Sequence, residues 1–206
     1  SGRVTVNSQI VELGTQIDPA EDIVEVDGRP VELPGELIYI ALNKPKDVVA
    51  SCSQPGEKIV LELVDLPQRI YPIGRLDKDS TGLLLLTNDG RLHHQLSHPG
   101  FDHEKEYEVT VTKPITDGAL RKLAEGLPMM KTRTRPARVK RLSTRRFQIV
   151  LREGKNRQIR RMVRKVGHQV AELKRIRVAN IKLGRLAPGT WRHLTQDEKK
   201  KLLKIL

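Results

Sequence analysis

The chain has 206 residues, a length that suits one domain of moderate size with a small appendage. Its 38 Lys and Arg against 25 Asp and Glu give a formal net charge of +13, which favours a polyanionic partner (RNA, DNA or an anionic membrane surface) over plain solvated charge. The single cysteine, Cys52, excludes an internal disulfide and a cysteine-rich zinc site, and no apolar run is long enough to span a bilayer, so we expect a soluble, cytoplasmic protein.

The first 34 residues alternate apolar and polar positions and contain turn signals at Asn7-Ser8 and Asp27-Gly28. This pattern predicts a few short strands. Segment 33–36 combines Pro and Gly and predicts a linker, so we divide the chain into a β-rich unit, 1–35, and a main domain, 36–206. Because the sequence begins without Met and part-way into an alternating pattern, we expect a further segment to precede it.

From residue 36 onward, predicted strands and helices are intermixed, which is typical of an α+β fold. Strands are predicted near 38–43, 81–87, 104–112, 137–142, 146–152 and 173–182, and helices near 57–65, 90–97, 116–125 and 156–166. Links such as 143–144 are too short for a parallel crossover, so antiparallel pairing should dominate. Thr195 and Glu198 form a capping box ahead of a basic final helix that is predicted to run through Leu206.

Sequence motifs of several common cofactors are absent. The sequence contains no Walker loop, no dinucleotide fingerprint, and no HExxH or comparable histidine spacing. Nucleotide-phosphate and zinc chemistry therefore have little support, and we expect neither a cofactor nor a metal.

A polar loop, 72–82, directly precedes the apolar strand residues 83–86. Its two glycines allow tight turns, and Arg75, Asp77, Lys78 and Asp79 place both signs of charge within about five residues. A rigid strand would hold such a loop in place, so the loop is a candidate site of catalysis. The alternative is an ordinary charged connection.

A second polar stretch, 102–106, runs into an alternating strand that contains Tyr107, one of only three tyrosines. A tyrosine ring at the start of a strand can stack on an extruded base, a contact worth roughly 1–3 kcal/mol. A half-buried tyrosine on an edge strand remains the alternative.

The third segment, 151–163, begins a helix with an apolar stripe on one side and many cations beside it. Gly154 ends the preceding strand, and Asn156 is predicted to cap the helix. The cations are Arg157, Arg160, Arg161, Arg164 and Lys165. Five like charges on about two turns repel one another unless phosphates or a buried carboxylate lie opposite them. The alternative is a basic helix face in solvent.

Four segments together resemble the motifs of pseudouridine synthases of the Rsu/Rlu branch, which act on ribosomal RNA. They follow one another in the expected order, at 42–45, 74–83, 105–107 and 153–162. The resemblance covers residues 38–194. It implies a mixed, mainly antiparallel sheet with a central catalytic cleft. It also implies isomerisation of uridine to pseudouridine by base flipping, without a cofactor or metal.

The resemblance also assigns roles to individual residues. Asp77 becomes the essential carboxylate that attacks or deprotonates the nucleotide, and Tyr107 stacks on the base and helps to remove the proton from carbon 5. Arg160 is expected to pair with Asp77 and keep it ionised, with Arg157 and Arg161 as alternatives. The other expected substrate contacts are Arg75, which enters the space left by the flipped base, Ile159, which walls the base pocket, and Lys44, Lys105, Lys155, Asn156, Arg157 and Arg161.

Partner assignments follow from the same motifs. Segments 73–80 and 102–107 look nearer to the Rlu members, so we expect a monomer that acts on large-subunit rRNA and binds no membrane. Residues 1–35 resemble the second half of the alpha-L RNA-binding module, whose preceding helices are missing here. The alternatives are a non-catalytic protein that binds rRNA or assists ribosome assembly and, with less support because no helix-turn-helix is evident, a DNA-binding regulator.

Overall fold

The computed structural model of the protein describes residues 2–18, 21–31, 35–98, 100, 102–129 and 132–204. The chain divides into two compact units, Ser1–Leu37 and Ile38–Leu206. Residues 33 and 34 of the predicted linker at 33–36, and the predicted helix end at Leu206, lie outside the described residues.

The first unit is a small antiparallel sheet with the strand order β2-β1-β3-β4. Its strands are β1 (Val4–Val6), β2 (Gln9–Ile10), β3 (Val24–Val26) and β4 (Arg29–Pro30). The predicted turns at Asn7-Ser8 and Asp27-Gly28 join β1 to β2 and β3 to β4, and all four turn residues have positive φ, as two-residue hairpin turns require. The prediction of short strands in this region is therefore confirmed.

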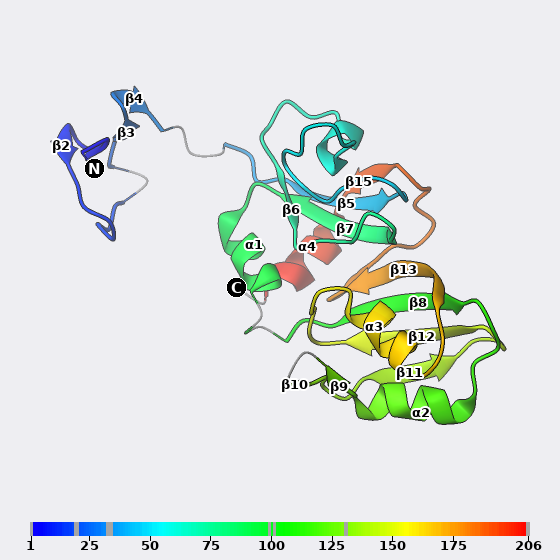
Figure 1. Cartoon of the computed structure of the whole chain (residues 1–206). Coiled ribbons are helices and arrows are strands. Elements are labelled where there is room, and N and C mark those ends of the chain that lie inside the picture. The colour runs from blue at the N-terminus through cyan, green and yellow to red at the C-terminus, as the bar shows by residue number, and fades with distance from the viewer. Residues whose placement is uncertain are drawn as a thin grey trace. The chain divides into compact units, whose positions relative to one another are not determined.

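The main unit is built on a nine-stranded sheet with the order β11-β12-β8-β13-β7-β5-β15, in which β14 also pairs with β13 and β6 with β7 (Figure 1). The strands are β5 (Tyr39–Lys44), β6 (Tyr71–Ile73), β7 (Thr81–Thr87), β8 (Lys105–Val111), β11 (Arg138–Arg141), β12 (Arg146–Leu151), β13 (Val170–Val178), β14 (Ile181–Lys182) and β15 (Trp191–His193). Strands β7 and β13 run parallel, and the other ladders of this sheet are antiparallel. The predicted α+β class with mainly antiparallel pairing is confirmed.

Helices and a short hairpin complete the main unit. They are the 3-10 helix η1 (Val60–Leu63), α1 (Gly90–Ser97), α2 (Asp117–Glu125), the hairpin β9 (Pro128–Met129) and β10 (Thr132–Arg133), α3 (Gln158–Lys165) and α4 (Gln196–Leu203). The side chains of Asp89 and Thr116 cap α1 and α2, and the predicted Thr195–Glu198 capping box begins α4. No helix among the described residues is both long and apolar enough to cross a membrane.

The buried face of the sheet packs against α3, which lies across β8 and β12 in Figure 1. Ile159, Met162 and Val163 of α3 join Val109 of β8 and Ile149 of β12 in one apolar cluster. The apolar stripe predicted for this helix therefore faces the core, and the basic residues lie on its other side.

Two predicted elements differ from the structure. The helix expected at 57–65 is only the short 3-10 helix η1, because the backbone around Ile59 is extended and bonds to Val49: Val49 N donates to Lys58 O and Val60 N donates to Val49 O. The strand expected at 173–182 breaks after Val178, because Ala179 adopts a left-handed conformation (φ 49°) that turns the chain from β13 into β14.

Gly82 marks the closest approach between β7 and β13. Its φ is +101°, and a Cβ placed there would lie 2.2 Å from the backbone oxygen of Arg175. Only glycine fits this contact without displacing backbone, so this residue allows the parallel pairing of Gly82 with Arg175 that joins the two halves of the sheet.

Candidate active site

A pocket of about 320 Å³ opens where β8, β12 and β13 meet the loop between β6 and β7 and the loop that leads into α3. The loop between β6 and β7 contributes Asp77, β8 contributes Tyr107, and α3 contributes Ile159. The full lining is Arg75, Leu76, Asp77, Ser80, Tyr107, Leu151, Glu153, Gly154, Lys155, Asn156, Arg157, Gln158, Ile159 and Leu173. The three segments singled out in the sequence thus converge on one cavity, in which the Asp77 carboxylate shares the lining with an aromatic ring and apolar side chains.

The loop that carries Asp77 is held from behind by buried cations. Arg175, which is 3% exposed, donates from Nε to Leu83 O (2.7 Å) and from an η nitrogen to Arg75 O (3.3 Å). The amide of Ser80 donates to Asp77 O (3.0 Å) and closes a tight turn. The Asp77 side chain itself remains 31% exposed, so its carboxylate is accessible from the pocket.

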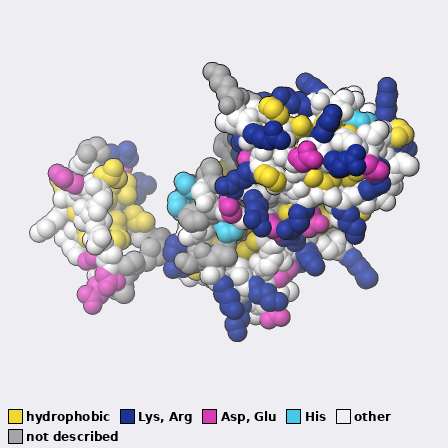
Figure 2. Space-filling model, turned by 90° about the horizontal axis from the view of Figure 1, so that it is seen from below, with side chains coloured by type: hydrophobic (Ala, Val, Ile, Leu, Met, Phe, Trp, Pro, Cys, Tyr) yellow, Lys and Arg dark blue, Asp and Glu magenta, His cyan; other side chains and the backbone are white. Residues whose placement is uncertain are grey.

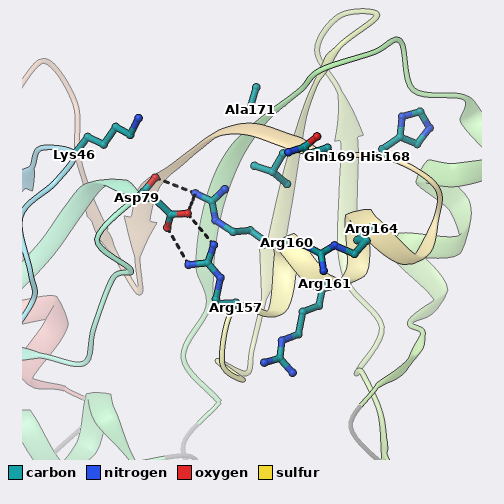
Figure 3. Close-up of a pocket in the computed structure, with 10 residues that line it drawn as sticks. Lys46, Asp79, Arg157, Arg160, Arg161, Arg164, His168, Gln169 and Ala171 are labelled. Atoms are coloured by element: carbon teal, nitrogen blue, oxygen red, sulfur yellow. Dashed lines mark hydrogen bonds and ion pairs between the residues drawn. The ribbon is translucent and has the colours of Figure 1, made fainter.

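The ion pair expected between Arg160 and Asp77 is not what the structure shows. Arg160 donates to Asp79 O (2.9 Å) and Ser80 Oγ (3.3 Å) and lies 3.4 Å from the Asp79 carboxylate (Figure 3). The guanidinium paired with Asp77 is that of Arg157, at 3.6 Å, which was one of the two alternatives expected from the sequence. The reason is geometric: Asp79 lies two residues further along the loop and offers Arg160 both its carbonyl and its carboxylate.

Asp79 and the two arginines form a compact charge cluster. Arg157 binds Asp79 with two hydrogen bonds, of 3.1 and 2.8 Å. This contact lowers the pKa of Asp79 and raises the pKa of Arg157. Burial lowers the pKa of Arg160, whose side chain is only 14% exposed. The loop between β6 and β7 therefore lies next to two positively charged side chains, one of which is largely shielded from water.

The start of α3 also differs from its prediction. Asn156 does not cap the helix; the N-cap residue is Arg157, in a left-handed conformation (φ 49°) and without a side-chain cap bond. The Asn156 amide oxygen instead accepts a hydrogen bond from Arg161 (2.9 Å). The turn is fastened by Gln158, whose side chain accepts from the Lys155 amide (3.0 Å), and this bond replaces the expected cap.

Lys44 was expected to bind substrate, and the structure contradicts this. Its side chain is fully buried (0% exposed), and Nζ donates to Val48 O (2.6 Å) and Pro45 O (2.8 Å), with Lys78 O at 3.5 Å. Lys78 directly follows Asp77, so the ammonium group helps to hold the loop from inside the protein. Burial lowers the pKa of Lys44 to about 8, against the opposing influence of Asp47 and two other carboxylates.

The lowered pKa of Lys44 predicts a distinct dependence of stability on pH. Below pH 8 the Lys44 amine is protonated in both the folded and the unfolded protein, and the cost of burying its charge destabilises the folded state. Between pH 8 and 10.5 the amine keeps its proton only in the unfolded protein, so the folded state becomes more stable as the pH rises. The free energy of unfolding should increase by roughly 2–3 kcal/mol across this window from Lys44 alone. Urea unfolding at pH 7.5 and pH 10 measures it, with Lys44→Met as the control that should lack this increment. An equal rise in both proteins would contradict the assignment.

The remaining predicted residues lie in two neighbouring pockets. Lys105 lines a cavity of about 530 Å³ that shares Arg75, Tyr107 and Lys155 with the first pocket. Arg160 and Arg161 line a basic pocket on the other side of Arg157. No group of three or more His, Cys, Asp or Glu side chains in the described residues is arranged to hold a metal ion.

Two residues that shape the site were given no role from the sequence. Asp79, which holds both arginines, had a signal, because it lies in the same charged loop and has the same side chain as Asp77. Arg175 had none: it lies in an ordinary stretch of β13, and only the pairing of β13 with β7 brings it behind the loop.

Comparison with known proteins agrees with this geometry. Residues 38–165 match the family model of RNA pseudouridylate synthases. The chain is 43% identical to the dual-specificity RNA pseudouridine synthase RluF of Salmonella typhi over 208 residues (100% of this chain, 71% of the relative). It is 41% identical to ribosomal large subunit pseudouridine synthase B of Bacillus subtilis (98% of this chain, 85% of the relative).

A solved structure extends the comparison to the fold. The crystal structure of a pseudouridylate synthase superposes with a TM-score of 0.78 at 32% sequence identity, covering 98% of this chain and 89% of the other. The resemblance drawn from the four motifs is therefore confirmed, as are the fold class and the enzyme class that it implied. The chain belongs to the RNA pseudouridylate synthase family.

Proposed function

We propose that the protein isomerises a uridine in ribosomal RNA of the large subunit and that Asp77 is its essential carboxylate. The observation that carries this proposal is the pocket in which Asp77 shares the lining with Tyr107 and Ile159. Such a cavity can accept a flat base that has left its stack, with a carboxylate at its edge. The name of the Bacillus subtilis relative supports the choice of the large subunit.

The reaction requires no added group. The bond from carbon 1′ to uracil N1 breaks, the base rotates, and a bond from carbon 1′ to carbon 5 forms, while carbon 5 loses a proton and N1 gains one. Asp77 starts this sequence by attacking or deprotonating the nucleotide. The guanidinium of Arg157 lies 3.6 Å from the carboxylate and holds it in place at the edge of the pocket, and Arg160 positions its loop through Asp79 O.

The other side chains of the pocket bind the substrate. Ile159 walls the base, and Arg75, which is exposed at the mouth, enters the space that the flipped base leaves in the RNA. Lys105, Lys155, Asn156 and Arg161 contact the RNA around the target nucleotide. The protein acts as a monomer in this proposal. Because its substrate is ribosomal RNA, it works in the cytoplasm.

Tyr107 offers a prediction that separates stacking from proton transfer. Tyr107→Leu removes the ring and should raise KM roughly tenfold or more, since stacking on a base contributes about 1–3 kcal/mol. Tyr107→Phe keeps the ring and should retain KM but lower kcat, because the hydroxyl can no longer help to remove the proton from carbon 5. Steady-state kinetics with melting temperatures as a folding control measure both effects. A Phe variant with the parent kcat would leave Tyr107 a stacking role only.

The proposal is tested by mapping pseudouridine in transcripts of large-subunit and small-subunit rRNA after incubation with the purified protein. We expect conversion at discrete positions of the large-subunit transcript. Conversion of the small-subunit transcript alone would overturn the choice of subunit. Binding of both transcripts without any pseudouridine would favour the non-catalytic RNA-binding alternative.

A further inference from the structure

Helix α3 carries its arginines on one side. Arg157, Arg160, Arg161 and Arg164 follow one another at spacings of three, one and three residues, which places them on neighbouring turns of the same face. Ile159, Met162 and Val163 fill the opposite side and are buried in the core. The arginines therefore lie on the face of the helix that points away from the apolar core, and they form a row of positive charge.

This row borders a pocket of about 570 Å³. It is separate from the pocket around Asp77, Tyr107 and Ile159 that we propose for the base (the uridine pocket), but both pockets are lined by Arg157. The lining is Lys46, Asp79, Arg157, Arg160, Arg161, Arg164, His168, Gln169, Val170 and Ala171. Its lining contains no Phe, Tyr or Trp, in contrast to the uridine pocket with Tyr107. Five cations in one lining suit an anion better than a nucleobase.

Charge is poorly balanced in this pocket compared with the rest of the main unit. Lys and Arg side chains cover much of the face in Figure 2, and several of them lie beside Asp or Glu. Outside the pocket, arginines are neutralised by ion pairs such as Arg146–Glu108 and Arg192–Glu198. Five cations line the pocket, and Asp79 is the one acid in its lining.

Asp79 is already engaged by two of these cations, Arg157 and Arg160 (Figure 3). Arg161 bonds to the neutral amide of Asn156, and within the described part of the chain Lys46 and Arg164 have no ion pair. Three positive charges are thus left over. Like charges this close repel one another, and an external anion would offset that repulsion.

We infer that this pocket binds the phosphodiester backbone of the substrate RNA, on the strand that continues from the flipped uridine. The inference rests on the proposed function, in that the substrate is RNA. Because Arg157 borders both pockets, a strand that delivers its base beside Asp77 passes directly along the row of arginines. Arg161, Arg164 and Lys46 then receive the phosphates, while Asp79 holds Arg157 and Arg160 in place.

Arg164→Gln tests this pocket, with Arg121→Gln as the matched control. Both arginines are exposed on helices, and Arg121 on α2 does not line the pocket. Affinity for a large-subunit rRNA transcript is measured against salt concentration. Losing one phosphate contact should make the negative slope of log K against log salt shallower by about 0.7–0.9 and should weaken binding roughly three- to tenfold. The control should keep the parent slope.

Neutral linkages locate the contact. Methylphosphonate groups are placed one at a time in the shortest fragment of the transcript that retains binding. We expect one or two linkages to weaken binding by the parent protein but to add no further loss in Arg164→Gln, because the contact is already missing. If each linkage affects both proteins equally, or if Arg164→Gln matches Arg121→Gln, the inference is overturned. These readouts need no catalysis, so a parent protein that forms no pseudouridine would refute the proposed function without touching this result.

Discussion

Asp77→Asn should reduce pseudouridine formation by roughly a thousandfold or more, with the affinity for RNA retained. The change preserves the shape of the side chain but removes the charge and the basic oxygen on which the reaction depends. The pocket contains a second carboxylate, that of Glu153, but its neighbours Lys155 and Gln158 already engage it. Single-turnover rates on an rRNA transcript, with binding measured in parallel, give both quantities.

Asp65→Asn is the matched control for this variant. Asp65 is an exposed aspartate outside the lining of the uridine pocket, so its substitution removes one negative charge without changing the site. The control should retain the parent rate. Pseudouridine formation by Asp77→Asn at the rate of the control would exclude Asp77 as the essential carboxylate.

Gly82→Ala should destabilise the main unit by about 3 kcal/mol or more. The new methyl group would lie 2.2 Å from Arg175 O and 2.7 Å from Arg175 N, and both are backbone atoms that cannot rotate away. Relief requires β7 and β13 to separate, which would shift the side chain of Arg175 that supports the loop of Asp77. We therefore expect a lower midpoint in urea unfolding and, in whatever fraction remains folded, a loss of activity.

Gly56→Ala separates this clash from backbone strain. Gly56 has a similar positive φ (+77°), but nothing lies within 4 Å of the position of its Cβ. This variant should cost only the strain of a left-handed alanine, about 1–2 kcal/mol, and should keep its activity. Equal losses of stability in the two variants would mean that the β7–β13 contact tolerates a methyl group.

Local features of the fold could be predicted from the sequence. The helix expected at 90–97 matches α1, the one near 116–125 matches α2 to within a residue, and the β11–β12 hairpin follows from the short link at 143–144. In these cases the caps, the apolar spacing and the turn all lie within about ten residues of one another. The segments that line the pocket around Asp77 could be singled out because each is a continuous motif, whereas Leu173 of the same lining belongs to none of them.

Features decided by distant parts of the chain were not predictable. Lys44 was expected to contact the substrate, but Val48 O and Lys78 O bind its ammonium group inside the protein. Which guanidinium meets Asp77 depends on the left-handed turn at Arg157, and no local pattern reports that conformation. Spacing along a helix defines which residues share a face, but it does not define what lies opposite them.

The two walls of the uridine pocket come from segments far apart in the chain, and they meet across the parallel pairing of β7 with β13. A contact between residues as distant as Gly82 and Arg175 closes a long loop, so it should form late, after nearby strands such as β11 and β12 have joined. Before β7 pairs with β13, the pocket that Asp77 and Leu173 both line does not exist. Recovery of enzyme turnover during refolding should accordingly lag behind recovery of the helical signal.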